Sequence, residues 1–97
     1  MPNYEAIGRC TKLKEEIEAL TLARNQAVVA IRRQLHGTLG ANAPSQVVYT
    51  LDAEQLHRHT KALEQANAKL MAAISEFNEY AAEGESSPYQ VLAPRNS

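Results

Sequence analysis

Apolar residues recur every three or four positions along the first third of the chain, and charged residues fill most of the positions between them. This spacing places the apolar side chains on one face of a helix. The sequence therefore predicts a helix over about residues 3–37, capped by Asn3 and ended by Gly37 and then Gly40. The apolar face of this helix comprises Ile7, Cys10, Leu13, Ile17, Leu20, Ala27, Ile31 and Leu35.

A second helix is predicted over about residues 52–83 from a more regular pattern. Four large apolar residues follow one another at intervals of seven, which is a heptad repeat typical of helices that pack together along a seam. They are Leu56, Leu63, Leu70 and Phe77. Asp52, with Gln55 three residues later, matches a capping box, and Thr50 is a second candidate for the cap. Gly84 is expected to end the helix, and Pro88 prevents its continuation.

Two polar residues lie at or beside this heptad seam. His59 follows Leu56 by three positions, and Asn67 lies in the equivalent region one repeat later. Polar residues on a seam set the alignment of two helices at some cost in stability. We expect both side chains to be half-buried.

The segment between the two helices, residues 38–51, is long for a helix–helix connection. Gly40, Asn42 and Pro44 each disfavour a helix interior, through backbone freedom, local hydrogen bonding and a missing N–H respectively. The segment also contains VVYTL, residues 47–51, which is apolar and β-branched. The prediction is a short extended segment that packs back on the helices; the alternative is an exposed apolar edge.

Residues 85–97 are predicted to form a mobile tail, because they are rich in Ser and Pro and show no periodicity. The tail nevertheless contains a short apolar segment, YQVL, at residues 89–92. This segment either docks against the helices of its own chain or serves as a short linear motif for a partner. Docking is the favoured interpretation.

The 97 residues are sufficient for one domain, here a hairpin over residues 1–84. Two helices of matched length joined by one loop fold back as a long antiparallel, coiled-coil-like hairpin, which places the chain in the all-α class. Further apolar residues lie beside each main face and exceed what one partner helix can cover. They are Leu22, Val28, Val29, Met71 and Ile74.

Association of two hairpins into a four-helix bundle would cover this additional apolar width. The sequence therefore predicts a homodimer, with the relative direction of its two copies left open. The residues predicted to carry self-association are Leu13, Ile17, Leu20, Ile31, Leu56, Leu63, Leu70, Ile74 and Phe77.

Charge changes sign between the two halves of the chain, although the net charge is only −1. Residues 1–50 carry six Lys/Arg and four Glu, and residues 51–97 carry four Lys/Arg and seven Asp/Glu. A hairpin would bring these halves together. Basic residues at the end of the first helix (Arg24, Arg32 and Arg33) would then lie near Asp52 and Glu54, and Arg9, Lys12 and Lys14 would lie near Glu76, Glu79 and Glu83. The low net charge argues against general binding to nucleic acid or to an anionic membrane.

The sequence contains little that indicates catalysis or metal binding. Cys10 is the single cysteine and lies on an apolar face, so we expect a small buried residue and no internal disulfide. His57 and His59 are two positions apart and would point about 200° away from each other on a helix, too far to share a metal ion. The sequence predicts no enzyme activity and no cofactor. Without a signal-peptide pattern or a membrane-length apolar run, it predicts a cytoplasmic protein.

Two functional hypotheses follow, from different classes. The favoured one is a protein-interaction module that self-associates and binds or inhibits an unidentified protein partner. The alternative is a small nucleic-acid-associated regulator that contacts phosphates through basic residues near the loop. Its candidate phosphate contacts are Arg24, Arg32, Arg33 and Arg58.

Overall fold

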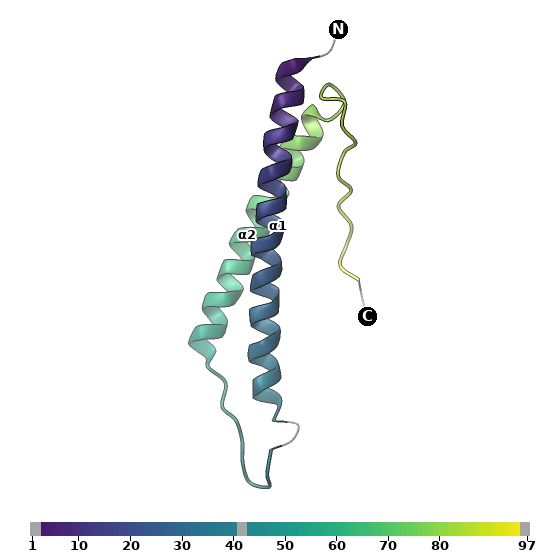
Figure 1. Ribbon diagram of the computed structural model, residues 1–97. Coiled ribbons are helices and arrows are strands. Elements are labelled where there is room, and N and C mark those ends of the chain that lie inside the picture. The colour runs from purple at the N-terminus through teal and green to yellow at the C-terminus, as the bar shows by residue number, and fades with distance from the viewer. Residues whose placement is uncertain (1–2, 41–42, 96–97) are drawn as a thin grey trace.

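Two long helices form the molecule and pack against each other. The computed structural model describes residues 3–40 and 43–95, and within those ranges it contains no strand. Helix α1 runs over Tyr4–Leu39 and helix α2 over Ala53–Tyr80. The two helices run in opposite directions and are joined at one end by a loop, so the molecule is elongated, measuring 72 × 26 × 15 Å (Figure 1). The predicted all-helical, two-helix arrangement is confirmed.

Both helices begin at the residues that the sequence indicated. The Asn3 side chain accepts a hydrogen bond from the N–H of Ala6 at 3.1 Å, and the Asp52 side chain accepts one from the N–H of Gln55 at 3.0 Å. Each cap satisfies a backbone N–H that has no partner within its helix. The chemistry of a cap is local, which explains why both were predictable.

Of the two glycines predicted to end the first helix, Gly40 does so and Gly37 does not. Helix α1 continues through Gly37 for two further residues and ends where Gly40 adopts a left-handed backbone, with φ of 59°. Glycine is tolerated inside a helix at a modest cost, and it ends a helix only where the backbone turns left-handed. Asn42, also predicted to break the helix, lies outside the described residues.

Helix α2 ends at Tyr80, three residues before the predicted end, and a tight turn over residues 81–85 follows. The N–H of Gly84 donates to the carbonyl oxygen of Tyr80, and the N–H of Ser86 donates to that of Ala81, both at 2.8 Å. The left-handed residue in this turn is Glu85, with φ of 57°. Gly84 is needed for another reason: a Cβ at this position would lie 2.6 Å from Cys10 Sγ.

The hydrophobic core occupies only one end of the hairpin. We call residues 3–19 and 70–95 the terminal half, and residues 20–40 and 43–69 the loop half. Every buried side chain among the described residues lies in the terminal half, including Cys10, as predicted from its position on the apolar face. The core comprises Ala6, Cys10, Leu13, Ile17, Leu70, Ala73, Ile74, Phe77 and Ala81.

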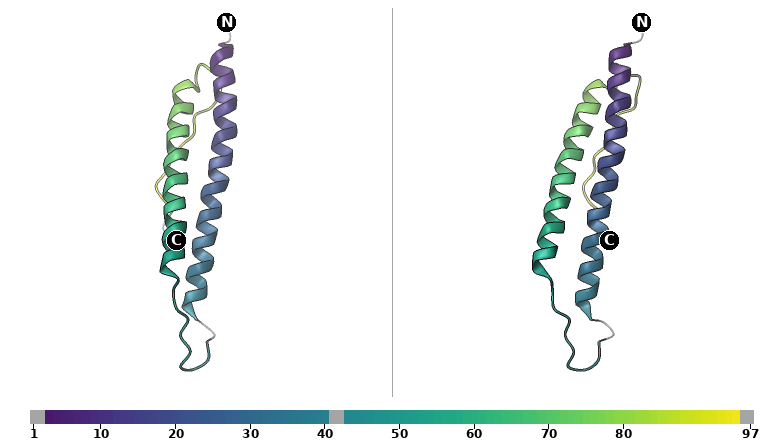
Figure 2. Two further views of the ribbon diagram at one scale, coloured as in Figure 1. Left: turned by 90° about the vertical axis from the view of Figure 1, so that its left-hand side faces the viewer. Right: turned by 60° about the vertical axis from the view of Figure 1, so that its left-hand side comes forward.

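The tail after α2 adds a third layer to the terminal half. It turns back beside the start of α1 and runs along the helices toward their middle (Figure 2). The ring of Tyr89 meets that of Phe77 edge to face, with centroids 5.0 Å apart and planes at 71°. The Asn78 side chain accepts from the N–H of Tyr89 at 2.9 Å and donates to its carbonyl oxygen at 3.1 Å. The predicted docking of the tail against the helices of its own chain is therefore confirmed at Tyr89. The mobility of the rest of the tail stays a prediction.

Asn78→Ala is expected to release Tyr89 from the helices. The substitution removes both hydrogen bonds to the Tyr89 backbone and should cost about 1 kcal/mol of stability. The amide of Tyr89 should then exchange its hydrogen faster, as measured by NMR. Asn25→Ala is the matched control, because within residues 3–40 and 43–95 the Asn25 side chain forms hydrogen bonds only with its neighbour Arg24. Equal Tyr89 exchange in the wild type and in Asn78→Ala would contradict the assigned role.

Candidate interaction surface in the loop half

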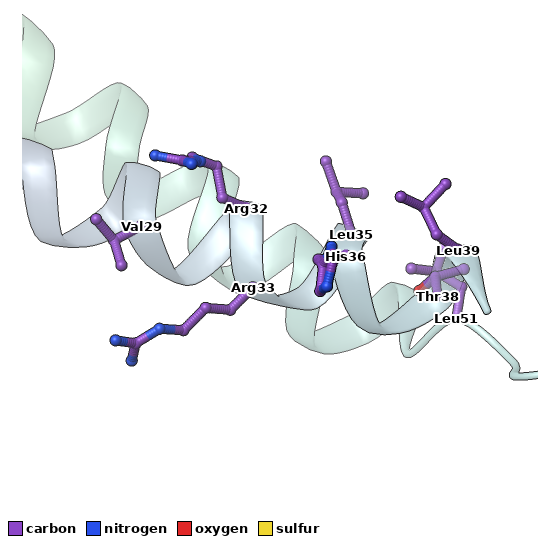
Figure 3. A pocket seen from close by; sticks show the side chains of 8 residues that line it. All are labelled: Val29, Arg32, Arg33, Leu35, His36, Thr38, Leu39 and Leu51. Carbon is purple, nitrogen blue, oxygen red and sulfur yellow. The ribbon is translucent and has the colours of Figure 1, made fainter. Parts of the chain in front are cut away.

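A wide apolar groove lies at the loop end of α1. We call it the loop-end groove; it has a volume of about 910 Å³ and is shown in Figure 3. Its apolar lining comes from Val29, Leu35 and Leu39 on α1 and from Leu51 in the loop. Leu35 is 47% exposed and Leu39 is 73% exposed. Side chains of this kind are normally covered, so their clustering marks an interaction surface.

Basic side chains border this groove. Arg32, Arg33 and His36 complete its lining together with Thr38. Figure 3 shows that Arg32 and Arg33 project in different directions from α1. Over residues 3–40 and 43–95, no Asp or Glu lies within ion-pair distance of either arginine. The groove therefore combines an apolar floor with unpaired positive charge.

Arg32 and Arg33 were predicted to lie near Asp52 and Glu54, and among the described residues neither arginine forms an ion pair with them. Gln34, which is half-buried between the helices, donates instead from Nε2 to the carbonyl oxygen of Asp52 at 2.6 Å. Arg32 and Arg33 are exposed on other faces of α1. Proximity of two segments in a hairpin does not by itself place two particular side chains on facing surfaces.

A second shallow groove continues the apolar surface along α1. It has a volume of about 420 Å³ and shares Val29 and Arg33 with the loop-end groove. Leu22 contributes its apolar side chain and is 60% exposed. Leu22, Val28 and Val29, the residues of α1 predicted to exceed the apolar surface that α2 can cover, are thus exposed. On α2 the outcome differs, because Ile74 is buried and Met71 half-buried in the terminal half.

The loop segment VVYTL is exposed throughout, so the prediction that it packs back on the helices is wrong. The chain makes a turn in which the N–H of Val47 donates to the carbonyl oxygen of Pro44 at 3.1 Å, and Val48 is 90% exposed. The middle of the loop projects beyond the ends of both helices (Figure 1). The Tyr49 ring lies against Gly40, and Leu51 lines the loop-end groove at the end of α1.

The residues predicted to carry self-association divide into two groups. Half-buried positions along the seam of the loop half are Leu20, Ile31, Leu56 and Leu63. The other five, Leu13, Ile17, Leu70, Ile74 and Phe77, are buried within a single chain. A second copy could contact these five only if the hairpin opened. The exposed residues Leu39 and Leu51 were not among the predicted set, although the apolar pattern continues past Gly37 to Leu39.

One of the two predicted seam residues is misplaced. His59 is half-buried, as expected, but Asn67 is exposed. In the loop half, the residues of α2 that face α1 include Leu63 and Ala66, which are both half-buried. Asn67 points away from α1 toward solvent. A shift of one position along a helix rotates a side chain by about 100°, so sequence spacing alone could not decide between these neighbours.

The four candidate phosphate contacts do not form one cluster. Arg32 and Arg33 share the loop-end groove, whereas Arg24 is half-buried and donates to the Asn25 side chain at 3.3 and 3.4 Å. Arg58 is exposed on α2 and does not line that groove. The arrangement thus provides two adjacent arginines and no extended basic track.

The opposite end of the hairpin is closed by polar contacts. Arg9, which was predicted to lie near Glu76, Glu79 and Glu83, forms an ion pair with Glu76, and its guanidinium lies 5.7 Å from the centre of the Tyr80 ring. The hydrogen bond that Arg9 donates to the Glu76 carboxylate, reinforced by the negative charge of that carboxylate, raises the pKa of Arg9. Asn3 donates to Glu83 at 3.2 Å across the same end. These contacts are exposed and contribute little to stability.

The described part of the chain contains no group of three or more His, Cys, Asp or Glu residues that could hold a metal ion. Neither of its helices is both long enough and apolar enough to span a membrane. No protein-family model, curated protein or solved structure shows a significant match to this chain. Functional inference therefore rests on the distribution of its apolar and charged surface.

Proposed function

We propose that this protein is an interaction module: a helical hairpin that self-associates through its loop half and, in the associated form, binds a protein partner. The observation that carries the proposal is the uncovered apolar surface of the loop half. Leu22, Val28, Val29, Leu35 and Leu39 are all exposed there. Full burial of a wholly exposed side chain of this kind is worth roughly 1.5–3 kcal/mol, so covering the 39–73% that stays exposed here is worth a part of that for each residue and favours association.

The total surface of the chain supports the same proposal. Its accessible area is 7865 Å², whereas a folded monomer of 10.7 kDa would be expected to expose about 5,500 Å². The radius of gyration is 19.3 Å, compared with about 12.5 Å for a globular domain of this length. The excess area of roughly 2,400 Å² on one chain exceeds the about 800 Å² that each partner of a standard protein–protein interface removes from water, so a second chain has ample surface to cover.

A nucleic-acid role is less well supported. Two adjacent arginines in the loop-end groove favour it, but they border an apolar floor of Val29, Leu35 and Leu39. Nucleic-acid surfaces are strongly basic because phosphate contacts supply most of the affinity. The net charge of −1 and the separation of Arg24 and Arg58 from the groove argue for a protein ligand.

The self-association proposal predicts that the double variant Leu35→Gln/Leu39→Gln dissociates to monomer. Wild type should sediment as a dimer at micromolar concentration, because its exposed leucines are covered by the second copy. The control is Ala72→Gln/Ala82→Gln, which places the same two polar side chains at exposed positions of the terminal half. Circular dichroism should show unchanged helix content in both variants. A wild type that is monomeric at every concentration would overturn the proposal.

Capture from lysate of the source cell distinguishes the two functional hypotheses. A tagged wild type and the variant Arg32→Glu/Arg33→Glu are compared with and without nuclease, and the bound material is identified by mass spectrometry and absorbance. A stoichiometric protein that survives nuclease and is lost with Leu35→Gln/Leu39→Gln supports the interaction module. Bound nucleic acid that disappears with the arginine variant would support the regulator instead.

A further inference from the structure

The outer side of α1, which faces away from α2, carries a row of exposed residues. The α1 residues that face α2, such as Leu20, Ala27 and Ile31, are half-buried, whereas every residue of this row is exposed. A helix turns by about 100° per residue, so steps of three, four or seven residues stay on one side of it. We call these residues the outer row; they are Glu15, Glu18, Leu22, Val29, Arg33 and His36.

The outer row is symmetric about its middle. The steps between its members are three, four, seven, four and three residues, so the spacing is the same from either end. Its chemistry is complementary under the same reversal, because acidic residues occupy one end, basic residues the other, and apolar residues the middle. Two copies of α1 that run antiparallel, with a two-fold axis between Asn25 and Gln26, would therefore place their outer rows level with each other. The opposed pairs are Glu15 with His36, Glu18 with Arg33, and Leu22 with Val29, each formed twice.

The charges of the outer row are available for a partner. Over residues 3–40 and 43–95, Glu15, Glu18 and Arg33 form no ion pair within their own chain. No Asp or Glu occurs between Glu18 and Asp52, so the basic end of the row has no acidic neighbour in that segment of the sequence. A parallel pair of rows would set like charges side by side, whereas an antiparallel pair sets opposite charges side by side. Charge complementarity of this kind selects a second copy in the antiparallel orientation.

The middle of the outer row is shaped to accept side chains from another helix. The shallow groove of about 420 Å³ lies there, and Leu22, Gln26 and Val29 are among the residues that line it. Leu22 is 60% exposed and Val29 is 41% exposed. In the antiparallel pair, Leu22 of the second copy lies against Val29 and enters this groove, and the two-fold axis repeats the contact. Long helices pack together through such insertion of side chains into hollows of the facing helix.

The outer row is separate from the surface on which the self-association proposed above depends. At about 100° per residue, Leu35 lies about 120° and Leu39 about 80° around α1 from Val29. The tail lies over other residues of α1, Ile17 and Thr21 among them. A dimer that covers Leu35 and Leu39 therefore leaves the outer row of each copy facing another direction.

We infer that the outer row is a second self-association surface, which pairs antiparallel with the outer row of a copy in a neighbouring dimer. This inference goes beyond the function proposed above and rests on it for the dimer that is joined. The contact contains two Leu22–Val29 pairs and otherwise exposed ion pairs, which individually contribute little. It should therefore form at higher concentration than the dimer, so dimers join into larger species as the concentration rises.

Charge reversal tests the pairing. Sedimentation of the wild type is expected to show the dimer at micromolar concentration and larger species toward millimolar concentration. Glu18→Lys and Arg33→Glu each set like charges opposite each other twice in every contact, and each should raise the concentration that the larger species require by about tenfold or more. The double variant Glu18→Lys/Arg33→Glu brings opposite charges together again and should restore assembly. Glu64→Lys, the control, makes the same change of charge at an exposed position of α2 and should have no effect.

Cross-linking tests the orientation. Gln26→Cys and Thr11→Cys are each made in the Leu35→Gln/Leu39→Gln variant, in which only the outer-row contact remains, and are treated with a short bismaleimide at millimolar concentration. Gln26 lies beside the two-fold axis, so Gln26→Cys should cross-link to itself. The two copies of residue 11 would lie about 44 Å apart along the helices, at 1.5 Å per residue, so Thr11→Cys should not. The unsubstituted background is the labelling control, because Cys10 is buried.

The outcomes separate this inference from the function on which it rests. A wild type that is monomeric at every concentration would overturn both. A wild type that remains a dimer up to millimolar concentration would overturn the outer-row contact and leave the proposed self-association standing. Assembly that the double charge variant does not restore, or self-cross-linking of Thr11→Cys, would overturn the antiparallel pairing. Nucleic acid that sediments with the larger species and is lost with Arg33→Glu would overturn the second copy as the occupant and assign the row to phosphate contacts. Restored assembly together with cross-linking at residue 26 alone supports the inference.

Discussion

Phe77→Ala is expected to lower the free energy of unfolding by about 3–5 kcal/mol, the largest loss from any single substitution considered for this chain. The Phe77 side chain is 2% exposed and lies where α1, α2 and the tail meet, with Tyr89 against its ring. Truncation leaves a cavity in the core and removes the surface on which the tail docks. A domain of this size has a total stability of only about 5–15 kcal/mol, so the loss is a large share of it.

The control for this prediction is Leu63→Ala, at a position of the same heptad series in the loop half. Leu63 is only half-buried, so its truncation should cost much less when the chain is monomeric. Urea unfolding followed by circular dichroism measures both losses, at one fixed and low protein concentration because association would stabilise the folded state. Equal losses at Leu63 and Phe77 under these conditions would show that the core is not confined to the terminal half.

Gly84→Ala is expected to destabilise the protein by about 1–3 kcal/mol, in the range of other substitutions that overpack a core. The added Cβ would lie 2.6 Å from Cys10 Sγ and 3.0 Å from the carbonyl oxygen of Ala6. The turn after α2 would have to move away from α1 to accommodate it. Combining Gly84→Ala with Cys10→Ala removes the closer of these contacts. The double variant should therefore lose less stability than the sum of the losses in the two single variants.

Gly37→Ala is the matched control and should have the opposite sign. Gly37 lies inside α1, and nothing lies within 4 Å of a Cβ placed there. Alanine in place of glycine inside a helix is expected to raise stability by roughly 0.5–1 kcal/mol. Thermal unfolding of the two single variants provides the comparison. A stabilising effect of Gly84→Ala would mean that the turn does not approach Cys10 closely.

The parts of this fold that could be predicted depend on neighbours in the sequence. Helix periodicity is repeated many times along each segment, and the caps at Asn3 and Asp52 form hydrogen bonds over three residues. Gly37, Gly40 and Gly84 illustrate the limit of this reasoning. All three looked like helix stops, but only Gly40 has the left-handed backbone that ends a helix. Gly84 serves the close approach of two segments far apart in the chain, which no local pattern records.

The candidate interaction surface was predictable in part. The excess apolar width of α1 indicated that Leu22, Val28 and Val29 would not be covered by α2, and they are not. The loop-end groove was missed because it depends on where the loop projects and on which side of α1 Arg32 and Arg33 lie. Those features follow from the rotation of each helix about its axis. The spacing of apolar residues in the sequence does not determine that rotation, so it cannot tell which of two neighbours, such as Ala66 and Asn67, faces the other helix.

The sequence by itself determined two amphipathic helices, their starting residues and the charge carried by each segment. It did not determine which part of the seam becomes a core, because Leu56 and Leu63 follow the same heptad pattern as Leu70 and Phe77. The tertiary structure decided that, through the return of a tail that has no periodicity of its own. Two helices meeting along one seam leave each side chain partly in contact with water. Only where Tyr89 and the turn at Gly84 add a third layer are the apolar side chains removed from water.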